Sequence, residues 1–192
     1  VPTALWIDEI GVIPTMRATL QRARRQQQST GTPTLVVFVV YNLPGRDCSA
    51  RASQGELKVG DLERYMNDFI GPIASVAEEF AEIPKVFVLE PDSLPNLVTN
   101  MGYPTCSAAA AGYKDGIAHA IRRLGPLGAV YIDAAWSGWI GTWDAPRLAK
   151  VMADVLDRAG AAARYVRGFV TNVSNYGTVA AEATYANAVR AG

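Results

Sequence analysis

The run Leu35–Tyr41 constrains the fold of this chain more than any other stretch. It reads LVVFVVY, and no polar residue interrupts it. A strand with one wet face alternates apolar and polar residues, whereas a strand covered on both faces reads as a continuous apolar run. The stretch therefore predicts a strand buried on both faces in a parallel sheet, whose strands are usually joined by helices.

The rest of the chain alternates predicted helices with predicted strands, which indicates an α/β architecture. Both a (β/α) barrel and a doubly wound sheet place their sites at the carboxyl ends of the strands, so this alternation leaves the two folds open. No repeat or linker divides the chain, and Val1–Asp8 is an apolar entry segment. Three more strands are expected at Lys85–Leu89, Ala129–Ile132 and Tyr165–Val170. Helices are expected at Ile13–Gln28, from Asp61 to about Ala81, and at Leu94–Asn100, Ser107–Leu124, Pro146–Arg158 and Val179–Arg190.

Charge and motifs exclude several classes of function. The 18 basic residues balance the 18 acidic ones, which argues against a nucleic-acid partner. No apolar run approaches the ~20 residues of a membrane span, and with no signal peptide the sequence is expected to be cytosolic or already processed. Phosphate-loop, dinucleotide, GxSxG and HExxH motifs are absent. His119, the single histidine, is interpreted as a helix-surface or packing residue, so histidine-dependent nucleophilic catalysis is not expected.

Carboxylates and aromatic side chains remain as the candidate functional groups of the chain. Asp47, Asp92 and Asp133 each follow a predicted strand, where a buried carboxylate is costly unless it is paired, hydrated or used. A pair of carboxyl groups is the usual equipment for hydrolysing a glycosidic bond, and aromatic rings stack on sugars. Three aspartates could instead hold Mg²⁺, so the generic pattern supports both chemistries.

Cys48 and Cys106 are each expected just beyond a predicted strand, in a loop. They could meet as a disulfide, which would favour a secreted protein, or remain two free buried thiols. No CxxC pair or Cys/His cluster indicates a zinc site.

Four segments carry a specific resemblance: VYNLPGRDCSARASQGE at 40–56, VLEPDSLPNLVTN at 88–100, YIDAAWSGWIG at 131–141 and TNVSNY at 171–176. In order and spacing they resemble glycoside hydrolase family 6, the cellulases that comprise cellobiohydrolases and endoglucanases. The resemblance implies a distorted (β/α) TIM-like barrel with parallel strands, of which residues 1–192 would form the N-terminal portion of a single catalytic domain. It also implies hydrolysis of β-1,4-glucan with inversion.

The resemblance assigns roles to residues near the cleavage point. Asp92 matches the proton donor, and Asp47 matches the aspartate that raises the donor's pKa and stabilises the developing charge. Tyr41 matches the tyrosine that distorts the scissile sugar, and Ser53 matches the serine that positions the attacking water. Cys48 and Cys106 match a family disulfide.

Other positions match substrate contacts. Trp6 and Asp8 match a pair on the non-reducing side, Trp139 matches the stacking tryptophan on the leaving-group side, and Asn175 matches an asparagine that contacts glucan. Trp136 stands where the family often has histidine. Asp133 is expected either to bind sugar or to make structural hydrogen bonds.

The family's later strands, which carry the candidate base aspartate, have no counterpart in these residues. The resulting hypothesis is a secreted, monomeric cellulase that acts on cellulose or cello-oligosaccharides without a metal or organic cofactor and without nucleic-acid or membrane partners. The alternatives are a non-catalytic glucan-binding protein or inactive fragment, and a Mg²⁺-dependent α/β enzyme.

Overall fold

The sheet has five parallel strands whose spatial order follows the chain. A computed structural model describes residues 3–192, except for the side chain of Arg51, so Val1 and Pro2 of the entry segment lie outside the described residues. Each strand pairs with the next along the sequence. A doubly wound sheet reverses its strand order at a switch point, whereas a barrel does not, so the observed winding is of the barrel type. The strands are β1 (Leu5–Ile7), β2 (Val36–Val40), β3 (Lys85–Leu89), β4 (Ala129–Asp133) and β5 (Val166–Val170).

The prediction of about four strands was wrong by one, because β1 lies inside the apolar entry segment. It is only three residues long, too short for its sequence pattern to separate it from a loop. Trp6 pairs with Val39 in the parallel register, which places its side chain beside the end of β2. The remaining strands agree with their predicted positions to within one residue.

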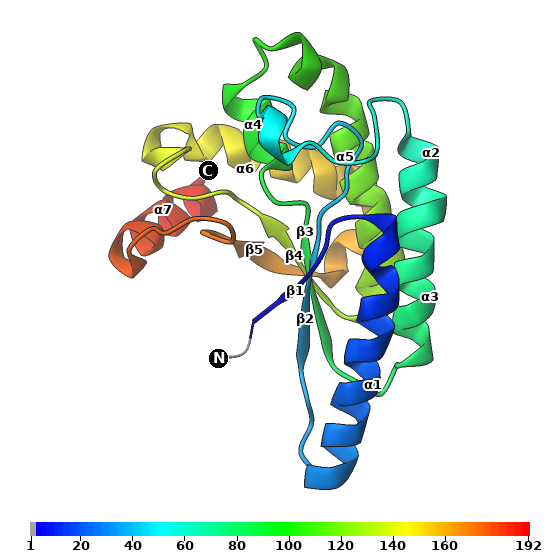
Figure 1. Ribbon diagram of the computed structural model, residues 1–192. Helices are drawn as coiled ribbons and strands as arrows, with labels where there is room; N and C mark the ends of the chain where they lie inside the picture. Colours follow the sequence, from blue (N-terminus) through cyan, green and yellow to red (C-terminus); the bar gives the residue numbers. More distant parts are fainter. Residues whose placement is uncertain (1–2) are drawn as a thin grey trace.

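The helices connect the strands and pack mainly on one side of the sheet, where α1, α3 and α5 stand side by side (Figure 1). Two helices begin earlier than predicted, at Pro104 and Gly141. Trp143, which precedes the predicted start at Pro146, therefore lies within a helix. The helices are α1 (Ile13–Thr30), α2 (Leu62–Arg64), the π-helical segment η3 (Tyr65–Ile70), α3 (Gly71–Glu79), α4 (Ser93–Thr99), α5 (Pro104–Leu124), α6 (Gly141–Ala159) and α7 (Val179–Ala191).

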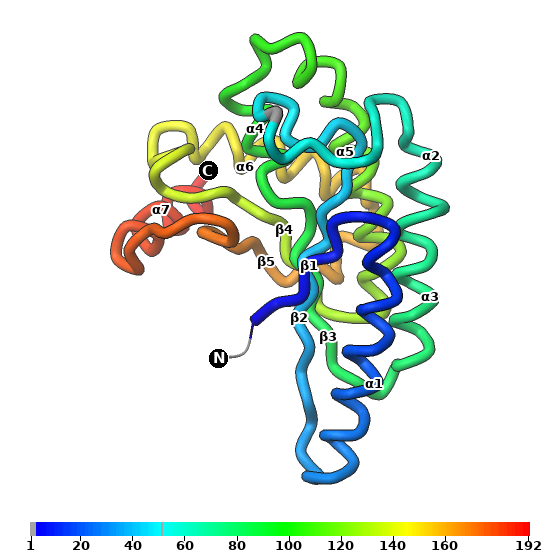
Figure 2. Tube along the Cα trace, viewed as in Figure 1, coloured from blue at the N-terminus to red at the C-terminus, as the bar shows by residue number. Residues whose placement is uncertain are grey.

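Both faces of β2 carry buried apolar side chains, as its uninterrupted apolar run predicts. Phe38 and Val40 enter the main core between sheet and helices. Val39 and Tyr41 join Val88 of β3 in a smaller cluster on the opposite face, against which Trp6 packs. In Figure 2 the chain continues upward from the ends of β2 and β3 into the segments that follow these strands. The second cluster lies on the face of the sheet opposite the main core.

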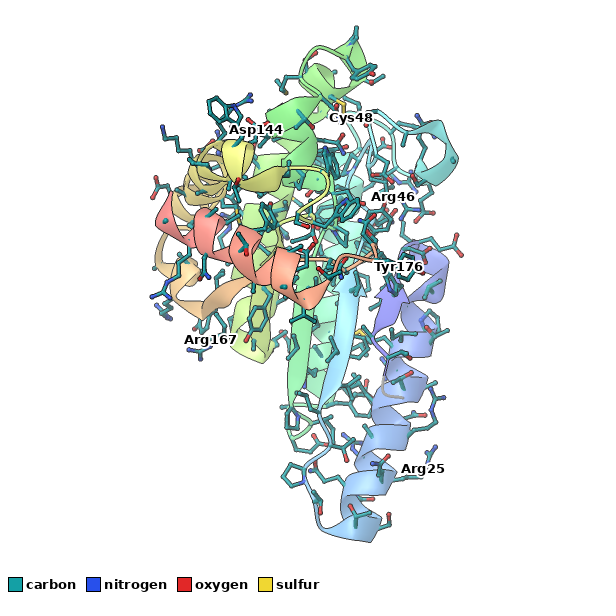
Figure 3. All side chains as sticks on the ribbon, turned by 90° about the vertical axis from the view of Figure 1, so that its left-hand side faces the viewer. Arg25, Arg46, Cys48, Asp144, Arg167 and Tyr176 are labelled. Carbon is teal, nitrogen blue, oxygen red and sulfur yellow. A yellow bond between two sulfur atoms is a disulfide. The ribbon has the colours of Figure 1, made fainter. Side chains whose placement is uncertain are left out.

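His119, the single histidine, and Arg25 both lie on helices. His119 is half-buried on α5, and Arg25 lies on the part of α1 far from Arg46 and Cys48 (Figure 3). No helix in the described range 3–192 is long and apolar enough to cross a membrane.

Candidate active site

Unusual backbone conformations gather where the strands end. Within residues 3–192, every non-glycine residue with a positive φ lies in a segment that follows β2, β3, β4 or β5. L-residues adopt this region at a cost, and such residues cluster at functional sites. Uncommon backbone conformations thus mark the carboxyl edge of the sheet as the candidate site. These residues are Asp47 (φ 50°), Glu90 (51°), Asp92 (64°), Ala135 (54°) and Asn172 (62°).

A cavity of about 370 Å³ opens at this edge. The structure brings eight of the ten predicted site residues together around it and adds Ser174. Asp8 and Asp133 are not among its lining residues. The lining residues are Trp6, Tyr41, Asp47, Ser53, Asp92, Trp136, Trp139, Ser174 and Asn175.

Asp92 is held by its backbone while its carboxyl group enters the cavity. Its N–H donates to Asp133 Oδ2 at 2.9 Å, and its carbonyl oxygen accepts from Asn96 Nδ2 at 2.8 Å. Burial, and then the nearby charge of Asp47, raise the pKa of Asp92 to about 6, while the hydroxyl of Ser174 opposes the shift. A carboxyl group with this pKa is still partly protonated in weakly acidic solution, as a general acid must be.

Asp133 is a buried carboxyl group that binds the backbone of Asp92. Only 2% of its surface is exposed, and its Oδ2 accepts the N–H groups of Asp92 and Ala135, both at 2.9 Å. Burial is the main reason that its pKa rises to about 7. Of the two sequence expectations for Asp133, these contacts match the structural one.

Tyr41 and Asp47 form a hydrogen-bonded pair beside Asp92. The Tyr41 hydroxyl donates to Asp47 Oδ2, and the tyrosine ring meets Trp6 edge-on with the centroids 5.6 Å apart. Burial and the bond to Asp47 raise the pKa of Tyr41 far above its ordinary value, so its hydroxyl stays protonated. The pair places a second carboxyl group and a protonated phenol together at one wall of the cavity.

Arg46 organises the loop that carries this pair. Its guanidinium lies 4.2 Å from the centroid of the Tyr41 ring and donates to three carbonyl oxygens, those of Asp8, Tyr41 and Ser53. Asp8 thus contributes its backbone carbonyl to the support of the site. Ser53 is brought to the cavity wall by the same arginine.

The predicted disulfide between Cys48 and Cys106 is confirmed. It ties the residue after Asp47 to the first turn of α5, where the Thr105 hydroxyl also donates to the Cys48 carbonyl at 2.6 Å. The expectation that Cys106 lies in a loop was wrong, because α5 begins two residues before it.

Tryptophans form the other side of the cavity. Trp139 Nε1 donates to Thr99 Oγ1 at 2.9 Å, which ties the ring to the end of α4. Two side chains of α7 hold the loop itself: Glu182 accepts from the Ser137 N–H at 3.1 Å, and Tyr185 donates to the Ala134 carbonyl at 2.6 Å. Trp143 is 90% exposed on α6 and lies outside the cavity lining.

The loop after β5 closes on itself and presents Ser174 and Asn175. Asn172 Oδ1 accepts from the Gly177 N–H at 2.9 Å, which bends the intervening residues toward the cavity. Ser174 Oγ lies 3.5 Å from Asp92 Oδ2. Sequence reasoning missed Ser174, although it lies inside the TNVSNY segment, next to a predicted site residue.

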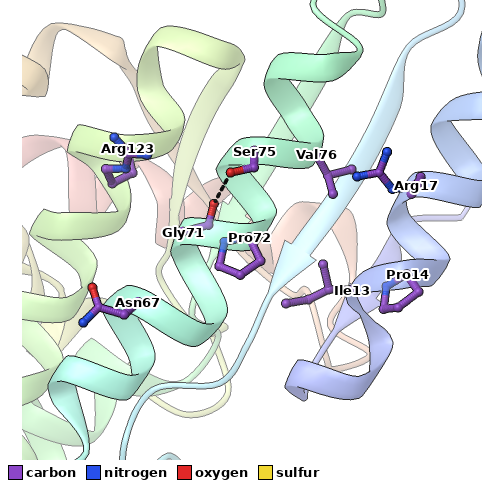
Figure 4. Close-up of a pocket in the computed structure, with 9 residues that line it drawn as sticks. All are labelled: Ile13, Pro14, Arg17, Asn67, Gly71, Pro72, Ser75, Val76 and Arg123. Atoms are coloured by element: carbon purple, nitrogen blue, oxygen red, sulfur yellow. Dashed lines mark hydrogen bonds between the residues drawn. The ribbon is translucent and has the colours of Figure 1, made fainter.

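A larger cavity, of about 640 Å³, lies among the helices and has different chemistry (Figure 4). Residues of α1, η3, α3 and α5 line it, and none of them is acidic. Its Arg17 is already paired with Glu79. Across residues 3–192, no group of three or more His, Cys, Asp or Glu side chains has the spacing of a metal site.

Comparisons with known proteins agree on one family. Glycosyl hydrolases family 6 matches residues 1–190. The 1,4-beta-D-glucan cellobiohydrolase CEL6B of Podospora anserina is 44% identical over 183 residues, which cover 92% of this chain and 44% of that protein. The chain thus spans less than half the length of this relative.

Solved structures show the same fold. The glycoside hydrolase family 6 enzyme CcCel6C from Coprinopsis cinerea superposes with a TM-score of 0.90 at 34% identity, covering 100% of this chain and 58% of that one. The CcCel6A catalytic domain, complexed with p-nitrophenyl beta-D-cellotrioside, gives a TM-score of 0.88 at 39% identity over 93% of this chain and 50% of that one. By sequence and by fold, this chain belongs to glycoside hydrolase family 6.

Proposed function

We propose that the protein containing these residues is a cellulase that hydrolyses β-1,4-glucosidic bonds of cellulose or cello-oligosaccharides, with Asp92 as general acid. The observation that carries the proposal is the position of Asp92, half-buried in an aromatic-lined cavity beside a second carboxyl group, with its pKa raised to about 6. Family membership and a relative printed as a glucan cellobiohydrolase support the substrate class.

The proposed reaction is a single displacement. Asp92 gives its proton to the glycosidic oxygen as that oxygen leaves the anomeric carbon, and a water molecule attacks the same carbon from the opposite face. The proton of that water passes to a base, so the anomeric configuration inverts. Inverting enzymes keep acid and base roughly 6.5–9.5 Å apart to leave room for the water.

The neighbouring residues have supporting roles in this proposal. Asp47 keeps the pKa of Asp92 high in the free enzyme and stabilises the positive charge that grows on the sugar ring. Tyr41 presses the scissile sugar out of its relaxed chair, and Ser53 orients the water. Trp6 lies on the non-reducing side and Trp139 on the leaving-group side, with Trp136 and Asn175 completing the contacts to glucan.

We also propose that residues 1–192 are the N-terminal portion of a single barrel domain. The matched relatives extend well beyond the aligned region, and the five strands follow one another as in part of a barrel. An intact mass well above 20.6 kDa would agree with this proposal. The disulfide supports a secreted protein, because such bonds persist in oxidising compartments.

Release of soluble sugar from swollen cellulose tests the function, with the full-length protein and its Asp92→Ala variant. A general acid contributes about 10²–10⁴-fold, so a loss of that order is expected. Asp115→Ala, which removes a surface carboxylate on α5 that pairs with Arg158, is the control and should keep full activity. Wild-type protein as inert as the variant, but still retained on cellulose, would favour the non-catalytic glucan-binding alternative. The freshly released sugar should be the α-anomer if the reaction inverts.

A further inference from the structure

Glu90 is a buried carboxyl group for which the proposed reaction has no role. It lies two residues before Asp92, is 1% exposed and does not line the cavity. Its Oε2 accepts from the N–H groups of Asn42 at 3.0 Å and Leu43 at 3.1 Å, and its Oε1 accepts from the Tyr65 hydroxyl at 2.8 Å. These partners belong to the start of the 42–60 loop and to η3, so one side chain joins three segments.

The backbone of Glu90 is fixed on both sides. Its N–H donates to the Val40 carbonyl at 2.8 Å, and its own carbonyl accepts from the Ser93 hydroxyl at 2.6 Å. Its φ of 51° lies in the left-handed region, which is uncommon for glutamate. A strained conformation that neighbouring contacts hold in place indicates a required geometry.

The partners of Glu90 are packed with little room to move. Tyr65 and Leu43 are fully buried, and both approach α5 at Gly116. A Cβ at Gly116 would lie 2.5 Å from Leu43 Cδ2 and 3.3 Å from Tyr65 Cε1. The loop start is thus pressed against α5 on one side and hydrogen-bonded to Glu90 on the other.

We propose that Glu90 is a positioning residue, which holds the Asn42–Leu43 backbone against the end of β3 and thereby sets Tyr41 and Asp47 relative to Asp92. This inference rests on the proposed function of Asp92. Tyr41 directly precedes the first N–H group that Glu90 holds, and Asp92 follows Glu90 by two residues. One carboxyl group therefore fixes both walls of the acid site.

The role requires acceptor geometry and not charge. Burial raises the pKa of Glu90 to about 7, so the group is largely neutral in weakly acidic solution. The two backbone bonds need only the lone pairs of Oε2, which the protonated group supplies as well as the carboxylate does. A glutamine can keep both backbone bonds through its amide oxygen, while its NH₂ group faces the Tyr65 oxygen and reverses the direction of that one bond.

Two substitutions in the full-length enzyme separate these requirements. Glu90→Gln should keep kcat within a few-fold of wild type, whereas Glu90→Leu, of similar volume but without an acceptor, should lower kcat on the order of 10²-fold, as small misplacements of reacting groups do. A folded Leu variant with wild-type kcat would overturn the proposal. A Gln variant as slow as the Leu variant would also overturn it, because charge would then be the requirement.

Lys85→Met is the matched control. Lys85 is also buried on β3, but at the opposite end, where it donates to the carbonyls of Phe80 and Ile83. Its loss should lower the melting temperature without lowering kcat in the folded protein. If Glu90→Leu does not fold, Glu90→Asp replaces it in the test, because the shorter side chain withdraws the acceptor by one methylene. The same loss of kcat is expected for Glu90→Asp, and a wild-type kcat would contradict the proposal.

Amide hydrogen exchange at Asn42 and Leu43 gives a readout independent of activity. Protection should persist in Glu90→Gln and fall in Glu90→Leu or Glu90→Asp. Wild-type protein without hydrolytic activity but with this exchange pattern would show that the function proposal fails while the hydrogen-bonded link remains. Unchanged protection in the variants that lack the acceptor would refute the link itself.

Discussion

Two loops line the same cavity and are held in different ways. The 42–60 loop carries Asp47 and Ser53 and is fixed by a disulfide, by Arg46 and by Glu90. The 134–140 loop carries Trp136 and Trp139 and depends mainly on hydrogen bonds from α7 and α4. Proton transfer requires the acid to lie within hydrogen-bond reach of the oxygen that it protonates, whereas stacking on a sugar face tolerates small shifts. The difference indicates that the fold fixes most firmly the loop on which the proposed proton transfer depends.

Removing the disulfide should have the largest effect on stability. Cys48 and Cys106 are 58 residues apart in sequence, and closing a loop of that length is worth about 4 kcal/mol in the chain-entropy account. The double variant Cys48→Ser, Cys106→Ser should lose about that much free energy of unfolding in urea titrations, and its kcat should fall because Asp47 adjoins the bond. Unchanged stability would remove the main distinction between the loops.

Asp47→Asn should move the pH dependence of catalysis. The like charge of Asp47 raises the pKa of Asp92, so its removal lowers that pKa. Because the general acid acts in its protonated form, the alkaline limb of the kcat/KM profile should shift to lower pH, by about one pH unit. Asparagine keeps an oxygen that can accept from Tyr41. A limb that stays in place or moves upward would contradict the electrostatic role.

Glu182→Ala should affect the tryptophan loop alone. It removes the acceptor of the Ser137 N–H, at a cost of about 1–2 kcal/mol, so KM for cello-oligosaccharides should rise roughly tenfold. The alkaline limb should not move, since Glu182 is not among the causes of the Asp92 shift. Glu182→Gln retains an acceptor oxygen and serves as the control. A shift of the limb in the alanine variant would show that the two loops are not independent.

Ser174→Ala should give the smallest change. The Ser174 hydroxyl lowers the pKa of Asp92 across 3.5 Å, so its loss should raise that pKa and move the alkaline limb upward by roughly a few tenths of a pH unit. Activity profiles measured in parallel with Asp47→Asn would show shifts of opposite sign. A downward shift with Ser174→Ala would refute the assignment of Ser174 as a donor to Asp92.

Strand-end chemistry was predictable because the sequence pattern is local. The apolar run before Tyr41 and the one before Glu90 show where the chain leaves the sheet, and parallel winding brings those ends together. The aspartates and tryptophans at those ends could be identified from the sequence motifs that contain them. This is why eight predicted residues line one cavity.

The supporting contacts were not predictable from the same patterns. Glu182 reaches Ser137 across 45 residues, and Asp133 turns its carboxylate to backbone N–H groups because Ala135 adopts a left-handed conformation. Asp8 contributes a carbonyl oxygen, which no side-chain motif encodes. Such contacts depend on side-chain direction and tertiary packing, which hydrophobic periodicity does not report.

Leaving-group dependence in the Asp92→Ala variant tests the central claim most directly. Hydrolysis of unsubstituted cello-oligosaccharides needs a protonated leaving oxygen, whereas a 2,4-dinitrophenyl β-cellobioside releases a stable anion without one. The account predicts a loss of about 10²–10⁴-fold on the former and a far smaller loss on the latter. Equal losses on both substrates would contradict the assignment of Asp92 as the general acid.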